Sequence, residues 1–437
     1  MALLIEYVKE FGRFQRNARL YLISIALSYA PVGIIVVLYN LYLSALGYKA
    51  DFIGLVLFMG AVGVGVAIFP AGICIDRFGG KWIMIWSSVL IGFAGAGQFL
   101  LRQPLPLLIS AFIAGIGAAF LVVVNAPFLT AHSDPEERSL LFSFAIVISL
   151  VMTVLGEVLG GVLPIWFRSQ SWAMFSVPTW FDHLLVSQPL ARSYQLSLLL
   201  AGVIAVPSFI PLFLMSNDRP SAPASAEEQQ TSAWSWRAVR ATIQGWQRMG
   251  MRVLVMNPLV VMTLFFLLLG MGAGMIIPYF NLYFVQHLGA SSALFGLIDG
   301  CANAFNALCT LLAPLLMLRI GRMRTLLLTR FISLPVMLII GLTSWLPLAA
   351  FLYPLRQCLM DMSNGILQAF AMEVAARRRG LANSSYQAAF QGSQAISAPL
   401  GGLLIVRVGY SAVFVVAVTF YLLALLLLWG RFARKSM

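Results

Sequence analysis

Long apolar runs, separated by short polar segments, repeat along nearly the whole chain. One membrane-spanning helix needs about 20 consecutive apolar residues, and the chain has twelve runs of suitable length. Because the interior of a bilayer offers no partner for backbone N–H and C=O groups, each run is expected to be an α-helix. The predicted spans are 20–46, 52–75, 82–101, 105–130, 139–166, 194–215, 256–286, 291–317, 325–343, 347–374, 381–406 and 411–430.

The longest polar stretch, 216–252, divides these spans six and six. Its first part is rich in Pro, Ser, Ala, Glu and Gln, which is typical of a flexible linker. Further along, Trp236, Val239, Ile243 and Trp246 recur at helical spacing, which favours an amphipathic helix lying on the membrane surface. The predicted organisation is an N-terminal six-helix bundle over 1–215, a cytoplasmic linker with an interfacial amphipathic helix over 216–252, and a C-terminal six-helix bundle over 253–437.

Composition excludes a soluble enzyme. Of 437 residues, 61% are hydrophobic and 10% are charged, whereas a soluble domain has about 25% charged residues. The net charge of +13 comes from short basic clusters between apolar runs, which does not favour nucleic-acid binding. With the predicted spans, 21 Lys and Arg residues fall on one side of the membrane and five on the other. Because basic residues are enriched on the cytoplasmic side, both termini are predicted to be cytoplasmic.

Two expectations concern single residues inside or beside the spans. The four cysteines, Cys74, Cys301, Cys309 and Cys358, lie in or at the ends of apolar runs and are expected to be packing residues rather than a disulfide framework. Arg330 lies close enough to the end of its span for its side chain to reach the polar membrane surface.

The two halves of the chain repeat. Asn40-Leu41-Tyr42 matches Asn281-Leu282-Tyr283 at an offset of 241 residues, and the offset then becomes 242 for further matches. Those include Gly47 with Gly289, Arg77 with Arg319 and Gly79 with Gly321. Two similar six-helix bundles around a midplane cavity are the architecture of many secondary transporters.

The segment after the second span reads Gly72-Ile73-Cys74-Ile75-Asp76-Arg77-Phe78-Gly79-Gly80-Lys81. It resembles the G-x-x-x-D-R-x-G-R-[RK] signature of the major facilitator superfamily, with Gly80 as one departure. A degenerate copy, Arg319-Ile320-Gly321-Arg322, occurs in the second half. The resemblance implies an all-α membrane fold and a conformational latch formed by Gly72, Asp76, Arg77, Gly79, Lys81, Arg319 and Gly321. The alternative for Arg77 and Lys81 is that they only set the topology.

Two further motifs of this superfamily are present in part. Gly115-Ile116-Gly117-Ala118-Ala119 resembles a G-x-G-A-A motif, but Ala111 stands where the family carries an arginine linked to proton coupling. Gly156-Glu157-Val158-Leu159-Gly160-Gly161 resembles the G-P-x-x-G-G motif of twelve-span bacterial drug and metabolite antiporters, with Glu157 in place of proline. The alternative is that these glycines only allow close helix packing.

Charged residues inside spans are costly and therefore suggest function. The clearest are Glu157, Asp299, Arg356 and Asp361. In the tenth span, Gln357, Asp361, Asn364 and Gln368 follow i, i+4, i+7, i+11, which predicts one polar stripe facing protein or water. These residues are the predicted substrate and coupling site: Asp361, Arg356, Gln357, Asn364, Gln368, Asp299 and Glu157.

Other polar side chains have two interpretations. Asn303 and Asn306 in the eighth span, and Gln387, Gln391 and Gln394 in the eleventh, either bind substrate or join helices. Asn40 and Asn281 occupy equivalent outer span ends beside tyrosines, and the favoured interpretation is an aromatic belt at the membrane surface, with an outer gate as the alternative. The tyrosines concerned are Tyr39, Tyr42, Tyr279 and Tyr283.

The expected function is secondary active transport of a small organic solute across the plasma (inner) membrane by alternating access, with proton-coupled efflux favoured. Asp361, Asp299 and Glu157 are the candidate proton carriers. The alternatives are uptake or facilitated diffusion of a polar metabolite, or a non-transporting sensor. No enzyme activity, cofactor, metal site or nucleic-acid partner is expected, and the protein is expected to act as a monomer in the lipid bilayer.

Overall fold

The computed structural model describes residues 14–134, 136–174, 184–216, 257–375 and 379–432, and within these ranges the chain is helical with no strand. The segment predicted as a linker with an amphipathic helix, 216–252, lies outside the described residues except for Ser216. Helices of the first half are α2 (Arg16–Ala45), α3 (Ala50–Phe78), α4 (Gly80–Leu100), α5 (Pro104–Ala131), α6 (Arg138–Ser169), α7 (Pro189–Ala205) and α8 (Phe209–Leu214). The short η3 (Val206–Ser208) joins α7 to α8, so that these two form one span.

The second half has the same order of spans. Its first span is formed by α12 (Pro258–Ile276), η4 (Ile277–Tyr279), α13 (Phe280–Leu282) and η5 (Tyr283–His287). The others are α14 (Ser292–Ile320), α15 (Arg322–Leu342), α16 (Leu346–Asp361), α17 (Asn364–Val374), α18 (Arg379–Arg407) and α19 (Tyr410–Phe432). The predicted boundaries therefore agree with the helices to within a few residues.

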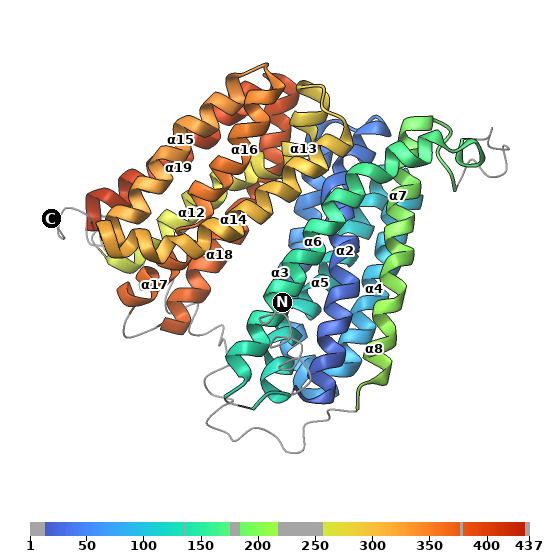
Figure 1. Cartoon of the computed structure of the whole chain (residues 1–437), viewed down its shortest axis with the longest axis horizontal. Coiled ribbons are helices and arrows are strands. Elements are labelled where there is room, and N and C mark those ends of the chain that lie inside the picture. Colours follow the sequence, from blue (N-terminus) through green and yellow to red (C-terminus); the bar gives the residue numbers. More distant parts are fainter. Residues whose placement is uncertain (1–13, 135, 175–183, 217–256, 376–378, 433–437) are drawn as a thin grey trace, which may run out of the picture.

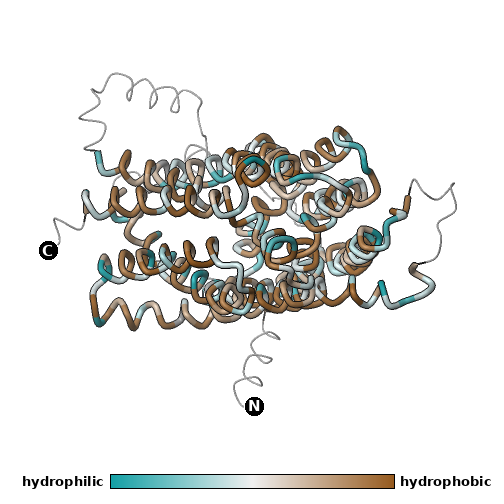
Figure 2. Tube along the Cα trace, turned by 90° about the horizontal axis from the view of Figure 1, so that it is seen from above, coloured by the Kyte–Doolittle hydropathy of each residue, from teal (hydrophilic) through white to brown (hydrophobic). Residues whose placement is uncertain are grey.

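Ten helices among the described residues are long and apolar enough to cross a membrane. The two predicted spans that fall short of this criterion are 347–374 and 381–406. The first is interrupted between α16 and α17, and the second, α18, contains several glutamines and serines. Figure 2 shows how apolar positions dominate the helices of both bundles.

The six spans of each half form one bundle, and the two bundles meet along a limited surface. Helix α3 packs against α18, and α6 packs against α14. Figure 1 shows the bundles in contact near the top of the view, around α13 and α2, and diverging below. We call the contacting end the closed end; it carries the turn between α2 and α3.

The internal repeat appears in the backbone as matching turns. Gly79, between α3 and α4, has φ 80° and ψ 159°, and Gly321, between α14 and α15, has φ 87° and ψ 155°. Gly47 and Gly289 likewise have φ values of 95° and 74°. Because this region of φ is unfavourable for residues with a Cβ atom, glycine at both members of each pair preserves the same turn.

The structure corrects both single-residue expectations. Cys309 on α14 and Cys358 on α16 form a disulfide, with their Cα atoms 5.9 Å apart, so the expectation of packing cysteines is wrong for this pair. Arg330 on α15 is fully buried instead of reaching the membrane surface, because polar side chains of the tenth span receive its hydrogen bonds.

Candidate functional site

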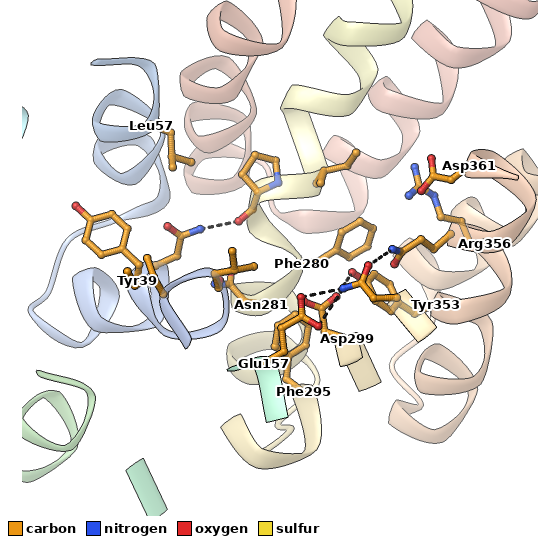
Figure 3. A pocket seen from close by; sticks show the side chains of 17 residues that line it. Tyr39, Leu57, Glu157, Phe280, Asn281, Phe295, Asp299, Tyr353, Arg356 and Asp361 are labelled. Carbon is orange, nitrogen blue, oxygen red and sulfur yellow. Dashed lines mark hydrogen bonds between the residues drawn. The ribbon is translucent and has the colours of Figure 1, made fainter. Parts of the chain in front are cut away.

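A cavity of about 450 Å³ lies between the bundles, next to the closed end (Figure 3). Both halves of the chain line it, with α2, α3 and α6 on one side and the first, second and fourth spans of the second half on the other. It collects five of the seven predicted substrate and coupling residues: Glu157, Asp299, Arg356, Gln357 and Asp361. The rest of its lining is Ile35, Val36, Tyr39, Asn40, Leu57, Ile277, Pro278, Phe280, Asn281, Phe295, Asn303 and Tyr353.

A hydrogen-bonded chain of polar side chains crosses from one bundle to the other in this cavity. The Gln357 Nε2 donates to Asn303 Oδ1 at 2.8 Å, and Asn303 Nδ2 donates to both carboxylate oxygens of Glu157, at 2.8 and 3.0 Å. Glu157 belongs to the first bundle, and Asn303 and Gln357 to the second. The contact therefore exists only while the bundles are together at this end.

A second acid lies beside this chain. Asp299, one helical turn from Asn303 on α14, is 7% exposed and accepts a hydrogen bond from the Tyr353 hydroxyl at 2.8 Å. Glu157 is 2% exposed. Two buried carboxyl groups, one from each bundle, thus share the cavity. Carboxyl groups placed in this way can bind a proton or hydrogen-bond a polar ligand.

Arg356 is the basic residue in the cavity lining, and its side chain is 5% exposed. Its guanidinium lies 5.9 Å from the ring centres of both Phe280 and Tyr421, and its Nη2 is 3.5 Å from the Tyr421 hydroxyl. Arg356 and Asp361 are five positions apart, which puts them on different sides of the helix, and the structure shows no ion pair between them. Within the described residues Asp361 accepts a hydrogen bond from Asn364 instead.

The predicted polar stripe on the tenth span is divided between two helices. The helix is interrupted at Met362 and Ser363, so Asn364 and Gln368 lie on α17 and do not line the cavity. Arg330 holds this interruption: its Nε donates to Ser363 Oγ at 3.0 Å and its Nη2 to Asn364 Oδ1 at 2.6 Å. Asn364 thus supports the shape of the span, and Gln368 is exposed.

The closed end is held by two equivalent hydrogen bonds between the repeats. Asn40 Nδ2 donates to the Pro278 carbonyl at 2.6 Å, and Asn281 Nδ2 donates to the Val37 carbonyl at 3.1 Å. Asn40 and Asn281, and likewise Val37 and Pro278, are related by the offset of 241 residues. The two bonds are therefore exchanged by the symmetry of the repeat, and the outer-gate interpretation of the two asparagines gains support.

The tyrosines next to these asparagines do not form a membrane-surface belt. Tyr42, Tyr279 and Tyr283 are fully buried and Tyr39 is 8% exposed. Tyr42 donates to the Phe99 carbonyl at 2.8 Å and Tyr283 to the Ile340 carbonyl at 2.5 Å, again at equivalent positions of the two halves. The Tyr42 and Tyr283 hydroxyls hold helices together inside each bundle, and the Tyr279 hydroxyl donates to Ala398 in its own bundle and to Ala50 in the other. The expectation of a membrane-surface belt is therefore wrong for these tyrosines.

The glycines of the partial G-P-x-x-G-G motif pack helices closely. A Cβ atom at Gly156 would lie within 3 Å of Ala30 on α2, and one at Gly161 would lie 2.7 Å from the Ser292 carbonyl in the other bundle. The equivalent Gly402 approaches Ala50 in the same way. Glu157 is thus placed on a helix face that must press directly against the second bundle.

Comparisons with known proteins agree with this architecture. A family model described as Major Facilitator Superfamily matches residues 21–377 and, in a second match, 262–436. The chain belongs to the major facilitator superfamily. It is therefore a transporter of this superfamily, embedded in a membrane, and not an enzyme. No curated protein sequence matches the chain significantly.

Solved structures of other superfamily transporters share the fold at low sequence identity. The nucleoside transporter NupG, in a mutant form, has a TM-score of 0.71 at 12% identity, covering 96% of this chain and 100% of that one. A bacterial homologue of the iron transporter ferroportin, in an inward-facing state, has a TM-score of 0.69 at 18% identity, covering 95% and 98%. A D-xylose–proton symporter has a TM-score of 0.64 at 14% identity, covering 94% and 96%.

The superfamily signature lies at the end where the bundles diverge. Lys81 Nζ donates to the Phe213 carbonyl at 3.1 Å, within its own bundle, and Arg77 and Arg319 are exposed. Gly72 has no neighbour within 4 Å of a Cβ position. Nothing is described for the side chain of Asp76. In this conformation the described residues of the signature contact their own bundle, so the latch role stays a prediction.

Three residues of the site were not assigned to it from sequence. Tyr353 lies in an apolar run and has no distinguishing pattern in the sequence. In the structure, α16 packs beside α14 and brings its hydroxyl to Asp299. Phe280 gives no polar signal at all. Asn303 had a signal, its spacing of four residues from Asp299, but a role in joining helices was equally consistent with that spacing.

Proposed function

We propose that this transporter couples the movement of a small organic solute to that of protons, and that it exports the solute across the plasma membrane with both termini in the cytoplasm. In this topology the closed end faces outward and the cavity opens toward the cytoplasm. The site residues proposed to act are Glu157, Asp299, Asp361, Arg356 and Gln357. Glu157 and Asp299 carry protons, and the remaining residues bind the solute.

The observation that carries this proposal is the position of Glu157. Its carboxylate comes from the first bundle and is held by Asn303 of the second, in contact with the same cavity as Asp299. Binding or release of a proton there changes the charge between the bundles. It therefore changes the free energy of bringing them together, which is the equilibrium that alternating access requires.

The test compares Glu157→Gln and Asp299→Asn with wild type at matched membrane expression. In an efflux-deficient bacterial host challenged with a panel of toxic organic compounds, wild type is expected to protect against at least one class. Glu157→Gln keeps the size of the side chain but cannot ionise. Its protection is expected to be at least tenfold weaker than that of wild type, which corresponds to a lost coupling free energy of about 1.4 kcal/mol or more.

Glu136→Gln is the matched control, because Glu136 is an exposed carboxylate outside the cavity. It is expected to protect as well as wild type. Full protection by Glu157→Gln would contradict the proposed coupling. Absence of protection by wild type against the whole panel would contradict export.

Uptake or facilitated diffusion of a polar metabolite is the second candidate, favoured by the polar wall of Asn303 and Gln357 and by Ala111 in place of an arginine linked to proton coupling. Solute transport that does not respond to a proton gradient indicates facilitated diffusion. Where protons move with the solute, the direction of their flow separates export from uptake. Release of protons from acid-loaded everted vesicles when solute is added indicates exchange. Solute-dependent proton entry into right-side-out vesicles indicates cotransport.

A further inference from the structure

The second bundle buries two arginines whose surroundings differ. Arg330 is fully buried and donates to Ser363 and Asn364, so two of its three nitrogen atoms have partners in the protein itself. Arg356 is 5% exposed and faces the cavity. Its Nε is buried without a hydrogen-bond partner, and its one side-chain hydrogen bond between described residues, to the Tyr421 hydroxyl, is long at 3.5 Å.

Two aromatic rings hold the Arg356 guanidinium in place. Phe280 and Tyr421 each lie with their ring centres 5.9 Å from its central carbon. Aromatic faces attract a cation but compensate only part of the cost of removing it from water. Asp361, five residues later in the chain, is engaged by Asn364. The Arg356 guanidinium therefore presents a positive charge to the cavity, with N–H donors that are free to bind a ligand.

The cavity has unlike ends. In Figure 3, Arg356 and Asp361 lie at one side, and Tyr39 and Leu57 lie at the opposite side. Gln357, beside Arg356 in the chain, adds an amide to the polar end, and Ile35 and Ile277 add apolar surface elsewhere in the lining. The carboxyl groups of Glu157 and Asp299 also line the cavity, so among the described residues of the lining Arg356 is the one basic side chain beside three acidic ones. A cavity of about 450 Å³ with this guanidinium at one end and apolar side chains elsewhere has room for a small molecule that has one acidic group and an apolar body.

We propose that the transported solute carries an acidic group, a carboxylate or a phosphate, and that Arg356 is the residue that binds it. The guanidinium offers a planar pair of donors that matches both groups. The proposal rests on the proposed function in that it takes this cavity to be the transport site. It assigns to Arg356 a role in recognition that is separate from proton coupling at Glu157.

The first test compares the same substitution at the two arginines. In purified protein without solute, Arg330→Met is expected to lower the melting temperature by several degrees, because Ser363 and Asn364 lose their donor. Arg356→Met is expected to leave the melting temperature unchanged or raise it, because the buried charge that is removed is only partly compensated by two rings and one long hydrogen bond. A fall at Arg356→Met as large as that at Arg330→Met would show a structural role and overturn the proposal.

The second test uses three probes of one size: benzoate, phenyl phosphate and the neutral benzamide. At least one of the two acids is expected to raise the melting temperature of wild type in a saturable way, and to have no effect on Arg356→Met. Stabilisation by benzoate alone identifies a carboxylate as the preferred group, and by phenyl phosphate alone a phosphate. Equal stabilisation by benzamide, or no effect of either acid on wild type, would overturn the proposal.

Glu157→Gln separates this proposal from the proposed function. It is expected to keep the stabilisation by the acid while losing proton-linked protection. If wild-type coupling proves absent but the Arg356-dependent stabilisation remains, the proposed function fails and the assignment of Arg356 stands. If coupling is present and the acid acts equally on Arg356→Met, the assignment of Arg356 fails alone.

Discussion

The two halves of this transporter are alike where they touch and unlike where they carry charge. At the closed end, equivalent residues exchange equivalent contacts: Asn40 with Pro278 and Asn281 with Val37. Beside the cavity the second half contributes Asp299, Arg356 and Asp361, whereas the first half contributes Glu157, whose equivalent in the repeat is Ala398.

This comparison separates two tasks. Closing one end requires two surfaces that fit, and a repeated sequence supplies both surfaces from one pattern. Binding a solute requires a particular set of charges, which a symmetric cavity would duplicate. The charged residues that differ between the halves therefore serve solute and proton binding. The residues that repeat serve the closing of the two bundles against each other. Three predictions test the symmetric part.

The largest effect is expected at the glycines between the bundles. At Gly161 and Gly402, even a Cβ atom would lie within 3 Å of backbone atoms of the other half. Gly161→Val and Gly402→Val each add that atom and two methyl groups. Overpacking of such a contact costs about 1–3 kcal/mol. This cost lowers the population of the closed state, in which the bundles meet at the closed end, by about 5- to 150-fold. Transport is expected to fall by a comparable factor in both variants.

The matched control is Gly65→Val on α3, because a Cβ atom there meets nothing within 4 Å. It is expected to transport at the wild-type rate. A large loss in Gly161→Val with none in Gly402→Val would show that the two contacts are not functionally equivalent.

An intermediate effect is expected at the two asparagines. Asn40→Leu and Asn281→Leu each remove one hydrogen bond between bundles, worth about 1 kcal/mol, or about a fivefold shift away from the closed state. Cross-linking by a short bifunctional thiol reagent between cysteines introduced at Ser44 and Gln286, whose side chains are in contact, measures the population of the conformation in which the bundles meet at the closed end. The free cysteines Cys74 and Cys301 are first replaced by serine.

The repeat predicts that the two asparagine variants reduce cross-linking equally, and that the double variant shows the sum of the two free-energy changes. Ser28→Ala serves as the control, since Ser28 bonds to the Ile25 carbonyl within its own helix. Unequal effects of the two single variants would show that the two hydrogen bonds do not stabilise the closed end equally.

The smallest effect is expected at the rim. Gln286 Nε2 donates to Ser44 Oγ across the repeat axis, but this contact is exposed and water replaces it readily. Gln286→Ala is expected to change the transport rate less than about 2-fold, since exposed hydrogen bonds contribute little net stability. A loss as large as that at Asn281→Leu would place the main gate at the rim and not at the asparagines.

All seven predicted site residues were chosen from sequence because a charge or amide in an apolar run is visible without any structure, and five of them line the cavity. Asn364 and Gln368 lie outside the cavity lining because helical periodicity assumes an unbroken helix, whereas the span is interrupted at Ser363, which bonds to Arg330, 33 residues away. Arg330 itself was assigned to the membrane surface because its distance from a span end, and not its neighbours, was all that the sequence offered.

The sequence by itself determined the number and order of the spans, the division into halves and the repeat. Each of these follows from local hydrophobicity or from direct matching of residues. Only the tertiary structure decided that Glu157 meets Asn303 and that Tyr353 meets Asp299. It also decided that Arg356 has one long hydrogen bond between described residues, to Tyr421, while Arg330 has two shorter ones. These facts depend on which helix faces turn toward one another, and packing between distant spans sets that rotation.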